Sequence, residues 1–238
     1  MRFEIGYTHQ FVKRFLQGGR CRILEVGCGA GELAARLSRD GHVVIAIDSD
    51  PESIAAARRL GVDARVAKWP DFDDGYFDAV LFTRSLHHLY PLDHSVRHTA
   101  DLLRDGGHII VEDFAYESAD EKTLHWFASA IRLLEATESL AAGDEFLETV
   151  LSKTETLKAW RQNHESELHP AAEIDAQLEK VFGSVVRENA AYYFRYIAKA
   201  ITTPEQRDAI LQALANQEET LGAEGSIVSL GRRFVAVK

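Results

Sequence analysis

The sequence predicts an α/β protein built on an open, doubly wound and mostly parallel sheet of seven strands. In the first half of the chain, short runs of apolar and β-branched residues alternate with segments of helical periodicity, and glycine turns separate them. A chain that alternates strands with helices in this order forms a parallel sheet with helices on its faces. Two further β-rich runs near the C-terminus complete the expected sheet.

Five strands are expected before residue 114. They are 22–26, 42–48, 62–67, 77–83 and 107–113. A helix with Leu33 and Leu37 on one face follows the first strand, and a helix that begins at Asp50-Pro51 and ends at Gly61 follows the second. A further helix over 93–105 precedes the fifth strand.

The signal changes to long helical periodicity between residues 119 and 168. Leu124, Phe127 and Ile131 share one face of the first expected helix in this region. We interpret the region as a helical insertion after the fifth strand and not as a second core.

The C-terminal part returns to the sheet. Helices are expected from Pro170 to Phe182 and from Thr203-Pro204 to Gly222, and the last two strands are 185–189 and 226–238. We therefore expect a single domain over residues 1–238. Its parts are a core at about 20–114, the helical insertion at about 115–170, and the C-terminal strands and helix at about 171–238.

Composition excludes several classes of protein. An apolar content of 46% supports a packed core and argues against a disordered or fibrous chain. The formal net charge of -10 disfavours nucleic acid as a partner. Only Cys21 and Cys28 are present, so we expect a reducing cytoplasm. No segment approaches the ~20 apolar residues of a membrane helix. A homodimer is compatible with this sequence.

The strongest motif is the glycine loop after the first strand. Gly27, Gly29 and Gly31 alternate between that strand and the helix that follows. Glycine lacks a Cβ atom and tolerates positive φ, so a loop of this kind lets a ligand approach the backbone closely. Dinucleotide-binding enzymes need the spacing G-x-G-x-x-G, whereas residue 32 here is Glu. The loop therefore predicts a small-ligand site of another kind.

The segment Glu25-Val26-Gly27-Cys28-Gly29-Ala30-Gly31, read as E-x-G-x-G-x-G, resembles the signature of class I methyltransferases that use S-adenosylmethionine (SAM). FDDGYFDAVLFTRSLHHL and LLRDGGHIIVEDF resemble further stretches of the same family, so the likeness covers nearly all of residues 20–114. The resemblance implies a Rossmann-like fold, SAM as the cofactor, and transfer of a methyl group to an oxygen, nitrogen or carbon of a small molecule.

The resemblance also implies roles for single residues. Glu25 and the backbone of Gly27 and Gly29 would surround the methionine part of SAM. Asp48 closes the second strand about 20 residues beyond the glycines, where a carboxylate is suited to accept hydrogen bonds from the ribose hydroxyls. The expected cofactor residues are Glu25, Gly27, Cys28, Gly29, Gly31, Asp48, Ser49, Ala67, Lys68, Trp69 and Thr83.

One departure from the family concerns adenine. The family often has an acidic residue after the third strand, where this chain has Ala67-Lys68-Trp69. Adenine recognition is therefore expected from the backbone of Ala67 and Lys68 and from the face of the Trp69 ring.

Candidate catalytic residues follow the fourth and fifth strands, because ligands of open α/β sheets bind beyond the carboxyl ends of the strands. His87, His88 and Asp113 are the candidate bases, needed only if the acceptor carries a proton on the reacting atom. The histidines are also open to a structural role, since paired histidines recur there in the family without being catalytic.

Several further aromatic and polar residues can be interpreted as functional or as structural. Trp126, Trp160, Tyr192, Tyr193 and Tyr196 are suited to cover the acceptor, and they are equally typical of a core. His164, Glu165 and His169 match no tight metal-binding motif, so no metal is expected.

Two other functions stay open at this level. An NAD-dependent oxidoreductase would share the sheet and the acidic residue, and a SAM-binding module without catalysis would share the loop. Titration with SAM and with NADH would distinguish the first alternative, and turnover to S-adenosylhomocysteine the second.

Overall fold

The computed structural model describes the chain apart from residues 1, 17, 142, 152–155 and 165–167. Its centre is a seven-stranded sheet in the order β3-β2-β1-β4-β5-β7-β6. The strands are β1 (Arg22–Val26), β2 (Val43–Asp48), β3 (Asp63–Val66), β4 (Phe77–Thr83), β5 (Leu103–Phe114), β6 (Val185–Ala190) and β7 (Gly231–Val237). Strands β1 to β5 pair in parallel, and β7 runs antiparallel to both of its neighbours. The expected doubly wound, mostly parallel sheet is confirmed.

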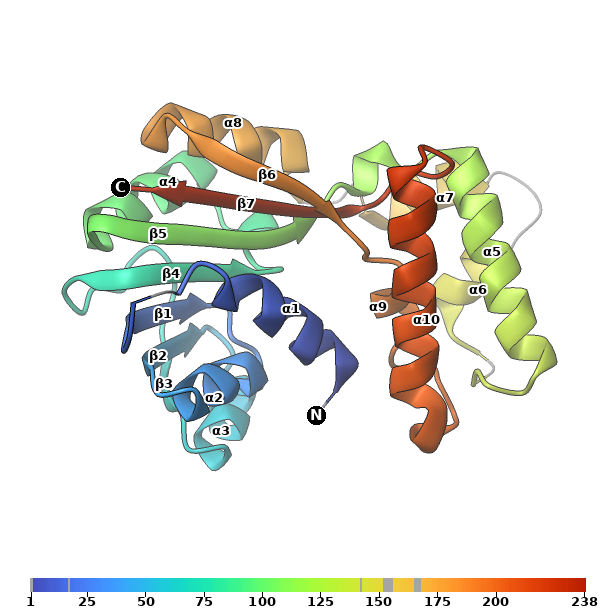
Figure 1. The fold of residues 1–238 in the computed structure, drawn as a ribbon, viewed down its shortest axis with the longest axis horizontal. Helices are drawn as coiled ribbons and strands as arrows, with labels where there is room; N and C mark the ends of the chain where they lie inside the picture. The colour runs from blue at the N-terminus through green and yellow to red at the C-terminus, as the bar shows by residue number, and fades with distance from the viewer. Residues whose placement is uncertain (1, 17, 142, 152–155, 165–167) are drawn as a thin grey trace.

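Helices cover both faces of this sheet (Figure 1). On one face lie α4 (Leu92–Leu102) and α8 (Ala171–Phe182), and on the other lie α1 (Phe3–Lys13), α2 (Glu32–Arg39) and α3 (Pro51–Arg59). Each face has its own apolar cluster, and because the central strands are buried on both sides they consist of nearly continuous apolar residues. That is why the sequence located these strands to within a few residues.

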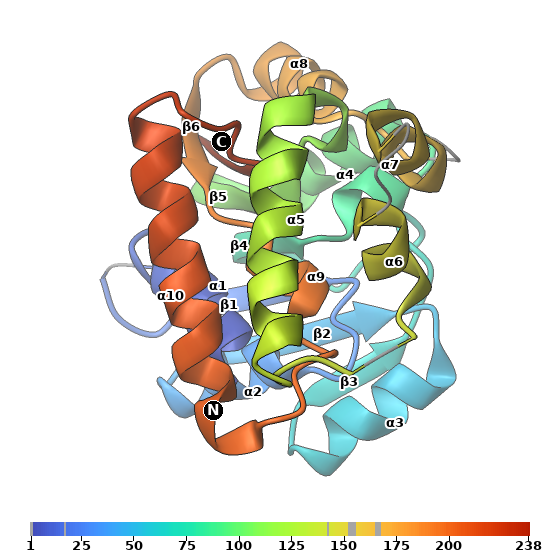
Figure 2. The same ribbon diagram turned by 90° about the vertical axis from the view of Figure 1, so that its right-hand side faces the viewer.

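A separate helical layer stands beyond the carboxyl ends of β4 and β5 (Figure 1). It contains α5 (Glu121–Ala136), α6 (Glu145–Leu151), α7 (Thr156–His164), α9 (Phe194–Ile197) and α10 (Pro204–Ala223). Figure 2 shows this layer from its outer side, with α5 and α10 in front of the sheet.

The helical layer has an apolar cluster of its own. Phe127 of α5, Trp160 of α7, Phe194 of α9 and Leu211 of α10 all belong to it and are fully buried. The expectation of an insertion without a second core is therefore wrong. The reason is that α9 and α10, which lie between β6 and β7 in the sequence, pack against the helices that follow β5.

Helix α1 was not expected from the sequence, and tertiary contacts explain its position. The rings of Phe3 and Tyr7 pack against Phe194 at centroid distances of 5.1 and 5.2 Å. The hydroxyl of Thr8 donates a hydrogen bond of 2.6 Å to the buried carboxylate of Glu112. Helix α1 therefore connects the sheet to the helical layer.

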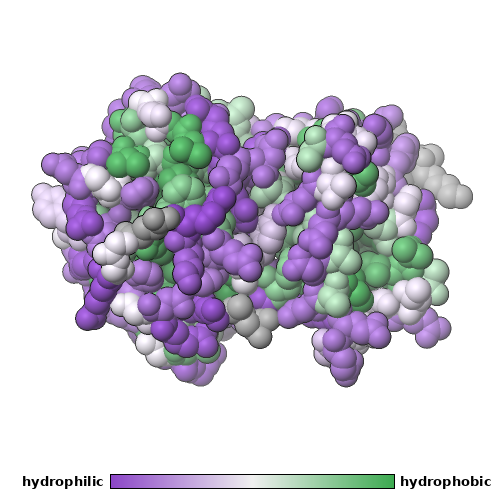
Figure 3. Space-filling model, in the orientation of Figure 1, coloured by the Kyte–Doolittle hydropathy of each residue, from purple (hydrophilic) through white to green (hydrophobic). Residues whose placement is uncertain are grey.

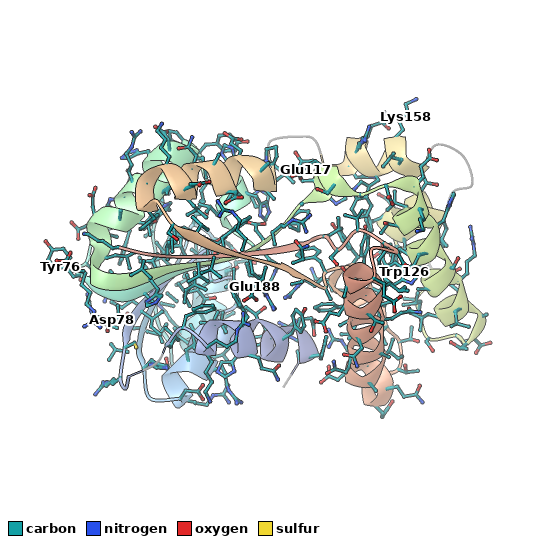
Figure 4. All side chains as sticks on the ribbon, turned by 45° about the horizontal axis from the view of Figure 1, so that its top comes forward. Tyr76, Asp78, Glu117, Trp126, Lys158 and Glu188 are labelled. Carbon is teal, nitrogen blue, oxygen red and sulfur yellow. The ribbon has the colours of Figure 1, made fainter. Side chains whose placement is uncertain are left out.

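The face of the molecule in Figure 3 is largely hydrophilic, with apolar areas over both the sheet and the helical layer. An apolar groove on the helical layer is lined by residues of α5 and α10. The groove has a volume of about 560 Å³, and Trp126 of α5 lies beside α10 at its wall (Figure 4). Cys21 and Cys28 are free thiols. Among the described helices, none combines the length and the apolar character required to cross a membrane.

Candidate active site

The glycine loop is fixed to the neighbouring strand by its backbone. The amides of Gly27 and Cys28 both donate to the carbonyl of Ile47 in β2, at 2.9 and 3.0 Å. Gly27, Gly29 and Gly31 all have positive φ, at 71°, 51° and 72°. Side chains rarely adopt this left-handed conformation, so each glycine is required by the path of the loop.

The three glycines differ in what surrounds them. A Cβ atom at Gly27 would lie 2.5 Å from the Cβ of Ser85, and one at Gly31 would lie 2.4 Å from the Cβ of Ala57 in α3. Gly29 has no heavy atom within 4 Å of that position. Gly27 and Gly31 thus permit close packing within the protein, while Gly29 presents open backbone to a ligand.

Asp48 at the end of β2 holds the loop from the other side. Its Oδ2 accepts a hydrogen bond from the amide of Gly29 at 2.9 Å, and its Oδ1 accepts one from the amide of Asp50 at 3.0 Å. A carboxylate offers about four acceptor positions, so two stay open for a ligand. Asp48 does not cap α3, because the carboxylate of Asp50 accepts from the amides of Glu52 and Ser53. The expected start of this helix at Asp50-Pro51 is confirmed, and Asp50 is its capping residue.

Glu25 is a buried acid at the inner end of the loop. It is 2% exposed, and its Oε1 accepts a hydrogen bond of 3.3 Å from the hydroxyl of Thr83. Its Oε2 has no hydrogen-bond partner among the described residues. Burial raises the pKa of Glu25 to about 7, against the smaller lowering effects of Thr83 and Arg84. A buried carboxylate oxygen without a partner is suited to a positively charged ligand group.

A cavity of about 220 Å³ lies beside Glu25 and the glycine loop, and Asp48 is not among its lining residues. Its lining residues are Arg2, Ile5, Thr8, Glu25, Gly27, Cys28, Gly29, Ala30, Glu32, Leu33, Thr83 and Arg84. Helix α1 and the residue before it provide one wall, and Arg2 forms an ion pair with Glu32 across the entrance. Cavities that enclose a whole small ligand measure roughly 300–1,000 Å³, so this one encloses a part of a ligand as large as SAM.

The cavity fits the methionine end of SAM. Gly29 leaves space beside its backbone, and the unpartnered oxygen of Glu25 suits the ammonium or the sulfonium of that ligand. The wall formed by Arg2, Ile5 and Thr8 was not foreseen, because nothing in the local sequence pattern connects α1 with the glycine loop.

The residues expected around adenine lie beyond this cavity. The amide of Ala67 donates to the carbonyl of Asp48 at 3.0 Å, so the chain after β3 stays beside the end of β2. Lys68 and Ser49 are exposed there. Trp69 is 9% exposed and packs in the core against Phe82 and His98. This favours a packing role for the Trp69 ring and leaves backbone as the accessible group for adenine.

His87 and Asp113 form a buried pair just beyond the carboxyl end of β4 and at that of β5. The Nδ1 of His87 lies 2.6 Å from the Oδ1 of Asp113, and the backbone amide of His87 donates to Oδ2 at 3.3 Å. Asp113 is 0% exposed and also accepts from the amide of Phe114. An ionised carboxylate only accepts, so the proton of the neutral imidazole lies on Nδ1 and Nε2 is the free base. Asp113 uses three of its about four acceptor positions in these contacts, which favours a role as the partner that orients His87.

His88 has a different environment from His87. It is exposed, its ring centroid lies 4.1 Å from that of His87, and no carboxylate orients it among the described residues. Partial burial and then the neighbouring charge of His87 lower the pKa of His88. Of the two histidines, His87 therefore has the geometry of an oriented base.

Glu112, the residue before Asp113, is the centre of a buried ion cluster. It accepts from Arg195 of α9 at 2.6 Å, from Arg233 of β7 at 2.8 and 2.9 Å, and from Thr8. Burial alone would raise the pKa of Glu112, but the charges of Arg195, Arg233 and Arg84 lower it to about 2. The cluster thus holds α1, the sheet and the helical layer together beside the cavity.

The aromatic residues of the helical layer form a core. Trp160 and Tyr193 are 0% exposed, and the indole of Trp160 donates to the carbonyl of Tyr116 at 2.9 Å. His164 contacts the carbonyl of Trp160 through Nδ1, and His169 pairs with Glu173. Glu165 lies outside the described residues. Within the described part of the chain no group of three His, Cys, Asp or Glu residues is placed to hold a metal.

Comparison with known proteins agrees with this geometry. Residues 24–111 match the family described as "Methyltransferase domain". A ubiquinone biosynthesis O-methyltransferase of Xanthomonas oryzae pv. oryzae is 29% identical over 201 residues, which cover 80% of each chain.

Solved structures share the fold at lower identity. The [4+2]-cyclase SpnF superposes with a TM-score of 0.58 at 19% identity, covering 98% of this chain and 81% of that one. The phosphoethanolamine N-methyltransferase 2 of Haemonchus contortus, bound to SAM, superposes with a TM-score of 0.59 at 16% identity, covering 98% and 52%. A cyclase and an N-methyltransferase on one fold show that the fold alone does not determine the reaction.

Proposed function

We propose that this chain is a class I SAM-dependent methyltransferase that acts on a small molecule, and that its acceptor is a hydroxyl group of a small aromatic compound. The observation that carries the proposal is the 2.6 Å contact between His87 and Asp113 where β4 and β5 end. An oriented imidazole is needed for an acceptor that must lose a proton, such as a phenol, and adds little for an unprotonated amine. Relatives named as O-methyltransferases support the choice of oxygen.

We assign a separate role in methyl transfer to His87 and to Asp113. Bound SAM supplies an electrophilic methyl group on a positively charged sulfur. His87 Nε2 takes the proton of the acceptor hydroxyl as the new oxygen–carbon bond forms and the sulfur–carbon bond breaks. Asp113 keeps the imidazole in the required tautomer and stabilises it once it is protonated. Holding the two reactants in line supplies much of the acceleration.

On the cofactor side, we assign the methionine part to Glu25, Thr83 and the open backbone at Gly29. The two free acceptor positions of Asp48 support its assignment to the ribose hydroxyls. The backbone at Ala67 and Lys68 is assigned to adenine; Lys68 is exposed and Ala67 is partly buried.

Further proposals concern the domain, the helical layer, the compartment and the class of acceptor. We propose that residues 1–238 act as one domain and that the helical layer covers the acceptor. The two free thiols support a reducing compartment such as the cytoplasm. The formal charge of -10 supports a small-molecule acceptor over a nucleic acid.

The test is turnover with matched acceptors. The purified protein is incubated with SAM and with phenols, catechols, and amines or thiols of similar size, and S-adenosylhomocysteine is measured. We expect turnover with the hydroxyl compounds and a loss of about 10²- to 10⁴-fold in kcat for His87→Gln. His94→Gln changes an exposed histidine of α4 and serves as the control.

Each alternative has a distinct result. Preference for amines or thiols would refute the acceptor assignment, and an active His87→Gln variant would refute the base. Tight SAM binding without turnover of any acceptor would favour a binding module.

A further inference from the structure

Three guanidinium groups converge on one buried carboxylate beside the cofactor cavity. Arg84, Arg195 and Arg233 all lie within 4 Å of Glu112, so three positive charges face one negative charge. A cluster of this kind has a positive excess of two. Excess charge of one sign beside a cavity favours a ligand group of the opposite sign.

Two of these arginines already satisfy Glu112. Arg195 contacts Oε1 at 2.6 Å, and Arg233 contacts Oε2 through two nitrogens at 2.8 and 2.9 Å. Thr8 adds a further hydrogen bond to Oε1. The guanidinium of Arg84 stays at 3.7 Å from the same oxygen, too far for a hydrogen bond. Among the described residues, Arg84 has no other ion-pair partner.

The backbone directs Arg84 toward the cavity. It follows Thr83 at the end of β4 and has a φ of 65°, one of two positive values at residues other than glycine in the described chain. Its amide donates to the carbonyl of Glu112 at 2.7 Å, which fixes this conformation. Such backbone conformations are energetically costly and concentrate at functional sites. The Arg84 side chain is 32% exposed and lines the cavity.

Among the described residues that line the cavity, Arg84 is the cation without a hydrogen-bonded carboxylate partner. Arg2 is paired with Glu32 at the entrance. Glu25 is buried at the inner end, and it forms no ion pair with Arg84 among the described residues, although the charge of Arg84 acts on it. The cavity therefore presents an acid at one place and an unsatisfied guanidinium at another.

An amino acid group matches this arrangement, because it carries an ammonium and a carboxylate on one carbon. We propose that Arg84 binds the α-carboxylate of the methionine part of SAM, in the cavity that Glu25 also lines. The inference rests on the proposed use of the cavity for SAM. A guanidinium can hold a carboxylate by two parallel hydrogen bonds, so the interaction fixes the orientation of that end of the ligand as well as its affinity.

Binding measurements separate the carboxylate from the rest of the ligand. Calorimetry compares S-adenosylhomocysteine with S-adenosyl-3-thiopropylamine, which lacks only the carboxylate. We expect Arg84→Gln to weaken S-adenosylhomocysteine by about 10- to 100-fold and to leave the affinity for the thiopropylamine within about threefold. Arg84→Lys keeps the charge and should lose less. Arg97→Gln, on the exposed side of α4, is the matched control.

The outcomes distinguish this inference from the proposed function. Equal loss of both ligands in Arg84→Gln, with an unchanged melting temperature, would overturn the carboxylate assignment. So would unchanged binding of both ligands, or a change confined to the KM of the acceptor, which would place an acceptor anion at Arg84. Failure of the unmodified protein to bind S-adenosylhomocysteine would refute the SAM site itself. If Arg84→Gln unfolds, the comparison of the two ligands is made with Arg84→Lys.

Discussion

The imidazole of His87 and the carboxylate of Asp113 meet at 2.6 Å because β4 and β5 end side by side. Thr83 pairs with Glu112 in the register of these parallel strands, so the residues that follow each strand emerge at the same edge. His87 is 5% exposed and Asp113 is fully buried. Water therefore competes little for this hydrogen bond, and the orientation of the imidazole is set by the fold before any acceptor binds.

We predict that Asp113→Asn reduces kcat far more than cofactor affinity. The asparagine amide can donate to Nδ1 and favour the tautomer that has its proton on Nε2, so His87 would no longer accept a proton there. We expect kcat to fall by about 10²- to 10⁴-fold while the Kd of S-adenosylhomocysteine stays within about threefold. The double variant with His87→Gln should lose little more than either single variant, because the two residues act as a unit. Additive losses would contradict this pairing.

Asp48→Ala should weaken SAM by about 1–3 kcal/mol, through loss of charged hydrogen bonds to the ribose. The same change removes the acceptor of the Gly29 amide, so the loop also loses a support. Calorimetric titration measures the effect. Asp50→Ala is the control, because Asp50 caps α3 two residues away and should lower the melting temperature without changing the affinity. If the Asp48→Ala variant and the unmodified protein bind SAM with equal affinity, Asp48 is not part of the SAM site.

Cofactor affinity should rise with pH because Glu25 has a raised pKa of about 7. The ionised acid attracts the positive groups of SAM and the protonated acid does not. The ionised fraction increases from roughly a tenth at pH 6 to nine tenths at pH 8, so we expect affinity to rise by up to about ninefold. Glu25→Gln should bind more weakly at pH 8 and show little dependence on pH in this window. A variant that keeps the pH dependence would assign it to another group.

The sheet and the glycine loop were predictable because their signals are local. β1 and β4 were located to the residue, since strands buried on both faces need continuous apolar residues. Gly29 and Asp48 were also identified, because a turn that needs positive φ and an acid that closes a strand can be recognised within a few residues.

The ion cluster at Glu112, helix α1 and the core of the helical layer depend on contacts between distant parts of the chain. Thr8, Arg195 and Arg233 lie 104, 83 and 121 residues from Glu112, and no local pattern connects them. The same reason explains why α1 was missed and why the helical layer was not recognised as a core. Sequence reasoning named Asp113 as a possible base, and only the distances show that its oxygens serve His87 and Phe114.

Glu112→Gln should destabilise the fold strongly. Removal of the charge leaves Arg195 and Arg233 buried without an anion, which typically costs about 3–5 kcal/mol. Urea unfolding at pH 7 measures the effect, and Glu188→Gln, which alters a more exposed pair with Arg14, should stay within about 1 kcal/mol.

The stability of the fold in acid should depend on the ion cluster at Glu112. The pKa of Glu112 is lowered to about 2 in the folded protein from an ordinary value near 4.5. Its contribution to stability is therefore complete above pH 4.5 and is lost as the pH falls from 4.5 through 2. The Glu112→Gln variant should lack this part of the acid loss when unfolding is followed between pH 5 and 2. An identical pH dependence in both proteins would show that Glu112 is not the titrating group.

Gly29 and Gly31 should respond differently to substitution by alanine, because of the two only Gly29 has open space at the position of a Cβ atom. Gly29→Ala places a Cβ in open space at a positive φ, so it should cost about 1–2 kcal/mol of stability and reduce SAM affinity by narrowing the cavity. Gly31→Ala adds a clash with Ala57 at 2.4 Å to the same backbone cost, so it should lower the melting temperature more. Combination of Gly31→Ala with Ala57→Gly removes the 2.4 Å contact with the Cβ of Ala57 and leaves a contact of 3.0 Å with the Cα of that residue. The double variant should then recover stability relative to Gly31→Ala, even though glycine within α3 costs about 1 kcal/mol. No such recovery would mean that the Cβ of Ala57 is not what requires glycine at this position.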